Sequence, residues 1–136
     1  RLYVSHSGNT IDNHIFVMKV SSKGNTKASY FFNVYNEDVK TKHLSTLKSN
    51  EIWKEIEETQ LLELDAKLTK NITKKVAFLD SGSVSIYYKK DNVMKNFYIE
   101  EPNYYIQNYS SVDEISRLNK FFLIIEKYYK IKFSTN

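Results

Sequence analysis

Four residues are of the types that assemble a hydrolytic site. Asp80, Ser81 and Ser83 lie close together in a turn-rich segment, and His43 lies earlier in the chain. A serine nucleophile, a histidine base and an orienting aspartate form the triad of many acyl-transfer enzymes. No nucleophile elbow surrounds either serine, and an aspartate beside serines and a glycine is more often part of a hydrogen-bonded turn. We therefore expect the chain not to be an enzyme.

Residues that bind metals and phosphates are sparse. The chain has three histidines, three glycines and no cysteine. The spacing of His6, His14 and His43 matches no common zinc motif. A bend that brings His6 and His14 towards Asp12 is an alternative, but exposed loop histidines are the commoner outcome. Isolated glycines build neither a P-loop nor a dinucleotide-binding loop. We expect no metal site and no cofactor.

Lysine and tyrosine are abundant, which makes nucleic-acid binding an alternative function. The chain carries 20 basic and 16 acidic residues, for a net charge of +4. Lys89, Lys90 and Lys95 lie near Tyr87 and Tyr98 in the sequence. Lysines neutralise phosphates and aromatic rings stack on bases, but arginine, the usual reader of bases, is nearly absent. A small lysine-rich nucleic-acid-binding domain is therefore the second interpretation.

Alternating apolar residues indicate several strands. The expected strands are residues 15–20, 27–36, 76–79, 84–89 and 93–99, with a short one at 131–133. Turn signals at 21–25 and 90–92 predict that the strands around them form hairpins. Pro102 should end the last of these strands, and residues 103–110 are expected to be a tyrosine-rich loop or a short strand.

Two segments carry the period of a helix. The first covers residues 51–68, has Ser49 or Asn50 as its N-cap, and is expected to break near 59–62. The second runs over 111–129 and is apolar nearly all round at its centre, which predicts that it is buried on more than one side. Ser111 and Glu114 have the spacing of a capping box at its start.

These elements predict an α+β fold with an antiparallel sheet built from hairpins and two helices packed on one face, in the order ββα-βββα. A chain of 136 residues suits a single domain, residues 1–136. As an alternative for its start, residues 1–13 form a flexible N-terminal segment. No apolar run approaches the roughly 20 residues that a membrane-spanning helix needs.

If both helices cover one face of the sheet, the opposite face offers a surface to a partner. Tyrosine supplies contact area at a low cost in side-chain entropy, and such surfaces often bind proteins. The expected partner-binding residues are Phe31, Tyr35, Tyr87, Lys89, Tyr98, Tyr104 and Tyr105. The alternative is that these rings only fill out a small β-rich domain.

The order of elements resembles that of small exported bacterial domains, often lipoproteins, and of some immunity proteins that block a toxic effector. The similarity lies in the aromatic strand at 30–35, the acidic helix at 51–58 with Trp53, the hairpin at 84–99 and the terminal helix. It includes no specific motif, so no functional residue carries over. It implies a periplasmic or cell-surface location, with the cytoplasm left open. Because the chain begins at Arg1, a removed leader, a lipid tether upstream or a longer parent chain is expected.

The sequence thus predicts a non-enzymatic protein-binding module. Its most concrete form is an exported inhibitor or immunity-type protein that blocks a partner through an aromatic sheet face.

Overall fold

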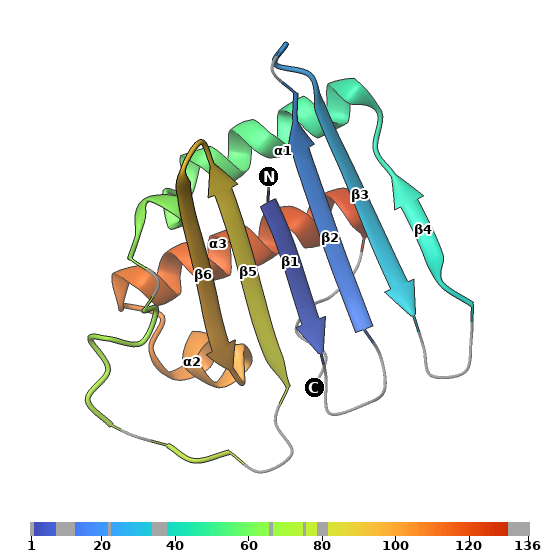
Figure 1. The fold of residues 1–136 in the computed structure, drawn as a ribbon. Helices are drawn as coiled ribbons and strands as arrows, with labels where there is room; N and C mark the ends of the chain where they lie inside the picture. The colour runs from blue at the N-terminus through green and yellow to red at the C-terminus, as the bar shows by residue number, and fades with distance from the viewer. Residues whose placement is uncertain are drawn as a thin grey trace.

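One sheet and one layer of helices make up the fold. The computed structural model describes residues 2–7, 13–21, 23–33, 38–65, 67–74, 76–78 and 82–130. In chain order, the elements are β1 (Leu2–Ser7), β2 (Asn13–Val20), β3 (Thr26–Asn33), β4 (Lys40–His43), α1 (Thr46–Glu58), the 3-10 helix η1 (Leu61–Glu63), β5 (Ser83–Lys90), β6 (Val93–Glu100), α2 (Pro102–Asn108) and α3 (Asp113–Tyr129). Figure 1 shows the strands side by side with the long helices behind them, which confirms the predicted α+β class.

The sheet has six strands in the order β4-β3-β2-β1-β5-β6, and every neighbouring pair is antiparallel. Both predicted hairpins, β2–β3 and β5–β6, are present. Strand β1 pairs with β2 on one side and with β5 on the other. The alternative of a flexible segment over residues 1–13 is therefore wrong for residues 2–7, which belong to the sheet. Leu2 and Val4 are buried in the core. Two apolar positions are too short a pattern to predict a strand, and pairing on both sides decides this one.

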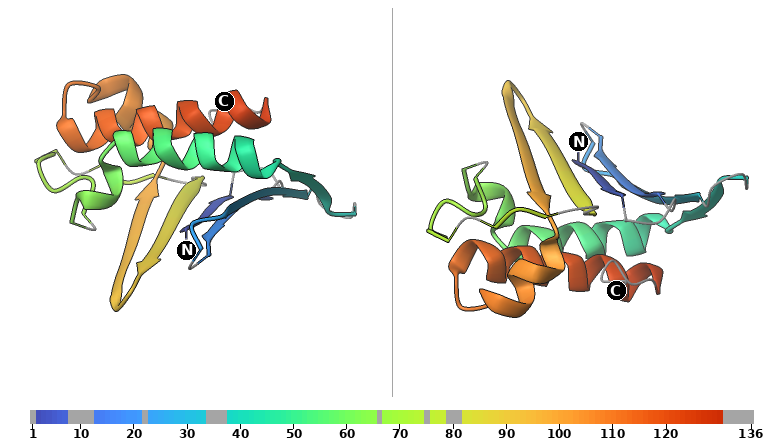
Figure 2. Two further views of the ribbon diagram at one scale, coloured as in Figure 1. Left: turned by 90° about the horizontal axis from the view of Figure 1, so that it is seen from above. Right: turned by 90° about the horizontal axis from the view of Figure 1, so that it is seen from below.

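Helices α1 and α3 lie on the same face of the sheet, as predicted (Figure 2). The third helix, α2, occupies residues expected to be a loop or short strand. Glu101 has a φ of 45° and turns the chain out of β6. Pro102 follows at the first helical position, where its fixed φ and missing N–H suit a helix start.

Other expected strands differ from the structure. Strand β4 was not predicted, because its four side chains are all exposed and show no apolar alternation. Residues 76–78 are described but form no strand. The remaining expected strand residues, 34–36, 79 and 131–133, lie outside the described residues.

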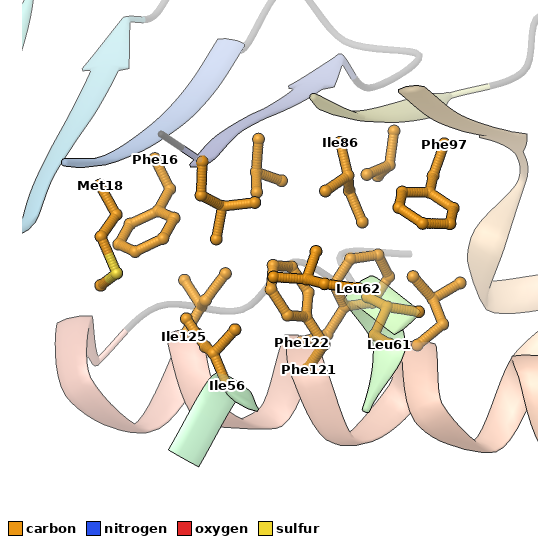
Figure 3. Packing of buried hydrophobic residues seen from close by; sticks show 14 of the residues in the cluster. Phe16, Met18, Ile56, Leu61, Leu62, Ile86, Phe97, Phe121, Phe122 and Ile125 are labelled. Atoms are coloured by element: carbon orange, nitrogen blue, oxygen red, sulfur yellow. The ribbon is translucent and has the colours of Figure 1, made fainter. Parts of the chain in front are cut away.

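The core fills the space between sheet and helices (Figure 3). The sheet contributes Phe16, Met18, Ile86 and Phe97, and the helical layer contributes Ile56, Leu61, Phe121 and Ile125, each at most 1% exposed. Burying a side chain of this size contributes roughly 1.5–3 kcal/mol. These contacts hold both long helices against the sheet.

Helix α1 begins earlier than predicted because its cap is Ser45, whose hydroxyl accepts a hydrogen bond from the Lys48 N–H. Ser49, one of the two expected caps, is instead fully buried within the helix. Its Oγ accepts a hydrogen bond from the Ala28 N–H at 3.1 Å and donates to the Leu44 carbonyl at 3.5 Å. Ser49 therefore joins α1 to β3.

The expected break after α1 is confirmed. The helix ends at Glu58, and Gln60 has a left-handed φ of 57° before η1 begins. The Gln60 carbonyl accepts a hydrogen bond from Arg117 on α3 at 3.0 Å. The break therefore places Leu61 and Leu62 in the core.

The capping box predicted for α3 is wrong. Its N-cap is Val112, which forms no side-chain cap. Glu114 is buried and accepts a hydrogen bond from the Asn71 amide at 2.7 Å. Asp113 instead forms an ion pair with Arg117 at 2.9 Å. Local spacing assigned the Glu114 carboxylate to the helix cap. In the structure, Asn71 from a distant segment donates a hydrogen bond to it instead.

An ion pair connects α1 and α3. The Lys127 ammonium donates to the Glu55 carboxylate at 2.5 Å. This hydrogen bond, with a smaller contribution from the Tyr128 hydroxyl, lowers the pKa of Glu55. The charged form of Glu55 is therefore favoured by folding.

We expect Ser49→Ala to lower the free energy of unfolding by about 1–3 kcal/mol, because the buried Ala28 N–H would lose its acceptor. Urea unfolding followed by circular dichroism measures this change. Asn50→Ala, at an exposed neighbouring position, is the matched control and should change stability by no more than about 0.5 kcal/mol. Equal stability of the two variants would contradict this assignment.

The Glu55–Lys127 pair should make stability depend on pH. Because folding lowers the pKa of Glu55, its contribution is present above the unfolded pKa of about 4.3 and is lost as pH falls through the lower folded pKa. Relative to Glu55→Gln, the wild type should gain about 0.5–1 kcal/mol at pH 7. That advantage should shrink below pH 4.

Thermal unfolding across this pH range compares the two proteins. Glu58→Gln, on an exposed residue of the same helix, serves as the control. An advantage of the wild type over Glu55→Gln that does not change with pH would rule out a role for the ionised carboxylate.

Candidate protein-binding face

The surface of the sheet opposite α1 and α3 is covered by no described helix (Figure 2). Side chains alternate along each strand, so residues between the buried core positions point to this side. We name this surface the open face; it is formed by Ile15, Val17, Lys19, Lys27, Ser29, Phe31, Tyr87, Lys89, Met94, Asn96 and Tyr98. All are partly or fully exposed.

Two aromatic side chains of the β5–β6 hairpin are held by neighbours on the open face. The Tyr87 hydroxyl donates to the Met94 sulfur at 3.2 Å. The Tyr98 hydroxyl donates to the Glu100 carboxylate at 3.3 Å. Tyr98 and Met94 remain 54% and 62% exposed. Side chains already held in one conformation lose less entropy when a partner binds.

The β2–β4 part of the open face carries a second apolar group. Phe31 is the register partner of Ile15 and lies edge-on to the ring of His43, with centroids 6.5 Å apart. His43 Nδ1 lies 2.7 Å from the Ser29 hydroxyl. Val17 is paired with Ser29 across the strands. Apolar side chains therefore lie on the open face in both halves of the sheet.

Lysines gather at the end of the open face where β2 ends and β3 begins. Lys19 and Lys27 are direct cross-strand partners and both are exposed. Lys89 lies at the same end on β5, with β1 between it and β2. Like charges placed opposite each other destabilise a strand pair. An acidic surface bound there would relieve this repulsion.

The structure brings together four of the predicted partner-binding residues: Phe31, Tyr87, Lys89 and Tyr98 all belong to the open face. Tyr35 lies outside the described residues. Tyr104 and Tyr105 lie on α2, in the helical layer, and their expected place beside the sheet surface is wrong. The reason is that the segment after Pro102 forms a helix and not a strand.

Tyr104 and Tyr105 belong instead to an aromatic cluster with Phe78 and Tyr109. Ring centroids are 5.3 Å apart for Phe78 and Tyr104 and 6.0 Å apart for Tyr105 and Tyr109. Burial raises the pKa of Tyr105, and the neighbouring Tyr104 and Tyr109 add to this shift. These contacts are those of packing residues.

The sequence pattern did not point to Ile15, Val17, Lys19 or Lys27 as surface residues. Ile15, Val17 and Lys19 alternate with Phe16 and Met18 along one strand. Nothing in the local sequence indicates which of the two sets of side chains faces the helices. The three lysines that lie close together in the sequence, Lys89, Lys90 and Lys95, do not all lie on the same side of the sheet. Lys95 donates to the Leu62 carbonyl at 2.6 Å on the helix side, whereas Lys89 lies on the open face.

The candidate hydrolytic residues do not converge. His43 on β4 and Ser83 on β5 are separated by β3, β2 and β1, which amounts to roughly 19 Å at about 4.8 Å per strand. Asp80 and Ser81 lie outside the described residues. A serine activated by this histidine as a general base would need to be in direct hydrogen-bond contact with it.

Two of the histidines considered for metal binding are neighbours in the sheet. His6 and His14 are register partners on β1 and β2, while Asp12 lies outside the described residues. Within the described ranges, no group of three metal-binding side chains comes together.

Comparison with known proteins adds no relative. No protein-family model matches the chain, and a search of curated proteins also finds no match. Among the described helices, none has the length and apolar character needed to cross a bilayer.

Proposed function

We propose that the protein is a non-enzymatic binding module whose open face docks on an acidic patch of a partner protein. The observation that carries this proposal is one face of the sheet that combines hydrogen-bonded aromatic side chains, aliphatic side chains and a lysine cluster. Interfaces favour tyrosine, phenylalanine and methionine. The lysines add charge complementarity, which steers association and selects acidic partners.

Inhibition of the partner, as in immunity-type proteins, is the most concrete form of this function, in an exported or surface-bound protein. A rigid sheet face suits this role, because it blocks a partner without changing its own shape. The similarity in element order supports this part of the proposal, and the open face supports the binding function itself.

The double variant Tyr87→Ala/Tyr98→Ala should lose binding while keeping its fold, because both rings lie on the surface and outside the core. Proteins captured from the native host by the wild type should be absent with this variant. For a captured protein, calorimetry should show an affinity loss of about 30-fold or more, since even one buried aromatic anchor contributes roughly 2 kcal/mol.

The matched control is Leu47→Ala/Leu123→Ala, which removes two exposed apolar side chains from the helical layer; these are 69% and 55% exposed. This control should capture the same protein with unchanged affinity. If the two double variants behave alike, the open face is not the docking surface.

Nucleic-acid binding is the second function to test, because Lys19, Lys27 and Lys89 lie on the same face as Tyr87. A fluorescent single-stranded oligonucleotide titrated at 50 and 200 mM salt should bind weakly at both concentrations if the partner is a protein. Tight binding that falls about 10-fold or more with salt and disappears in Lys19→Ala/Lys27→Ala would favour nucleic acid instead. Lys54→Ala/Lys74→Ala, at exposed positions, controls for total charge.

A further inference from the structure

A pocket lies on the other side of the sheet from the open face. The β5–β6 hairpin leans away from the helical layer at its tip (Figure 2). At that end of the sheet, a pocket of about 440 Å³ opens between α1 and the ends of β1, β2 and β5. This volume falls within the range of small-molecule sites. Neither the proposed binding function nor the core packing uses this space.

The inner surface of the pocket is apolar and aromatic. Leu2 and Met18 line it and are each 1% exposed. Trp53 on α1 and Tyr88 on β5 also line it, with ring centroids 6.5 Å apart and planes tilted by 31°. Both rings are only half-buried, so they remain accessible to a ligand. Aromatic faces attract organic cations through their quadrupole, tryptophan most strongly.

Two carboxylates add negative charge to this pocket. Glu57 follows Trp53 by one helical turn, and Asp91 follows Tyr88 in the turn between β5 and β6. Neither carboxylate forms an ion pair with any residue that the structure describes. Burial raises the pKa of Tyr88, and the charges of Glu57 and Asp91 raise it further.

Lys89 and Lys90 also line the pocket. Alternation along β5 directs Lys89 to the open face and leaves Lys90 on the side of Tyr88. Neither lysine is among the groups that shift the pKa of Tyr88, whereas both carboxylates are. The charges that act on the Tyr88 hydroxyl are therefore those of the two carboxylates.

We propose that this pocket binds an organic cation with a compact apolar body. The cation would contact Trp53 and Tyr88 and be neutralised by Glu57 and Asp91, while its apolar part would lie on Leu2 and Met18. A guanidinium or ammonium side chain of a protein and a free quaternary ammonium compound share this chemistry.

Trp53 gives the test a specific signal, because it is the only tryptophan of the chain. The protein is titrated with choline and with its uncharged isostere 3,3-dimethylbutanol, and with N-acetylarginine amide and its uncharged isostere N-acetylcitrulline amide. Tryptophan emission and the single indole N–H resonance are followed. At least one cation should shift both signals saturably, and its neutral isostere should bind about 10-fold more weakly or not at all.

Variants separate a charge effect from a change in fold. Glu57→Gln/Asp91→Asn should weaken binding of the cation about 10-fold, since both neutralising charges are lost. Asparagine suits position 91, where φ is 53°, because it tolerates the left-handed conformation. Glu58→Gln, next to Glu57 but outside this pocket, should bind like the wild type.

Tighter binding of N-acetylarginine amide would identify a protein side chain as the ligand. Tighter binding of choline would identify a free quaternary ammonium compound as the ligand. Either result supports the proposal. The proposal is overturned if neither cation shifts the Trp53 signals. It is equally overturned if the neutral isosteres bind as well as the cations, or if 3,3-dimethylbutanoate binds more tightly than choline, since the lysines would then dominate. These results do not depend on the open face, so the two proposals fail separately.

Discussion

The pairing of β1 with both β2 and β5 makes one sheet out of two smaller ones. This strand has six residues and forms hydrogen-bonded ladders on both edges. Without it, β2–β3–β4 and β5–β6 would each expose an additional edge, and a two-stranded hairpin alone is marginal in water. Its second ladder joins the start of the chain to a strand that follows α1. The core that both long helices cover exists only once this long-range pairing has formed.

The position of the helices then determines which surfaces are available. Helix α1 connects β4 to β5, and α3 follows β6 through α2, yet both long helices return to the same face. Their apolar sides pack against one face of the sheet. The other face therefore keeps partly exposed aromatic rings without a described helix over them. Two contacts hold the helices of this layer together. The ion pair between Glu55 and Lys127 joins α1 to α3, and the hydrogen bond from Arg117 to the Gln60 carbonyl joins α3 to the residue before η1.

Strand β5 separates two surfaces of different chemistry. Tyr87 belongs to the open face, whereas Tyr88 lines the pocket together with two carboxylates and the two lysines at the end of β5. The two-residue period of a strand places adjacent tyrosines on opposite sides. A protein with an acidic patch and a small organic cation would therefore bind at different places and would not compete for the same rings.

The sequence by itself determined the hairpins β2–β3 and β5–β6, the two long helices, the break after α1 and the α+β class, because each depends on periodicity or turn residues within a short segment. Only the tertiary structure decided that residues 2–7 form the central strand, that Lys40–His43 adds an edge strand, and that residues after Pro102 form a helix. It also gave Glu114 and Ser49 distant partners in place of local caps. Periodicity shows that an element has an apolar side but not what will lie against it. Alternation could therefore place Phe31, Tyr87, Lys89 and Tyr98 on strand faces in advance, while the positions of Tyr104, Tyr105 and the Trp53 pocket depended on which segments pack together.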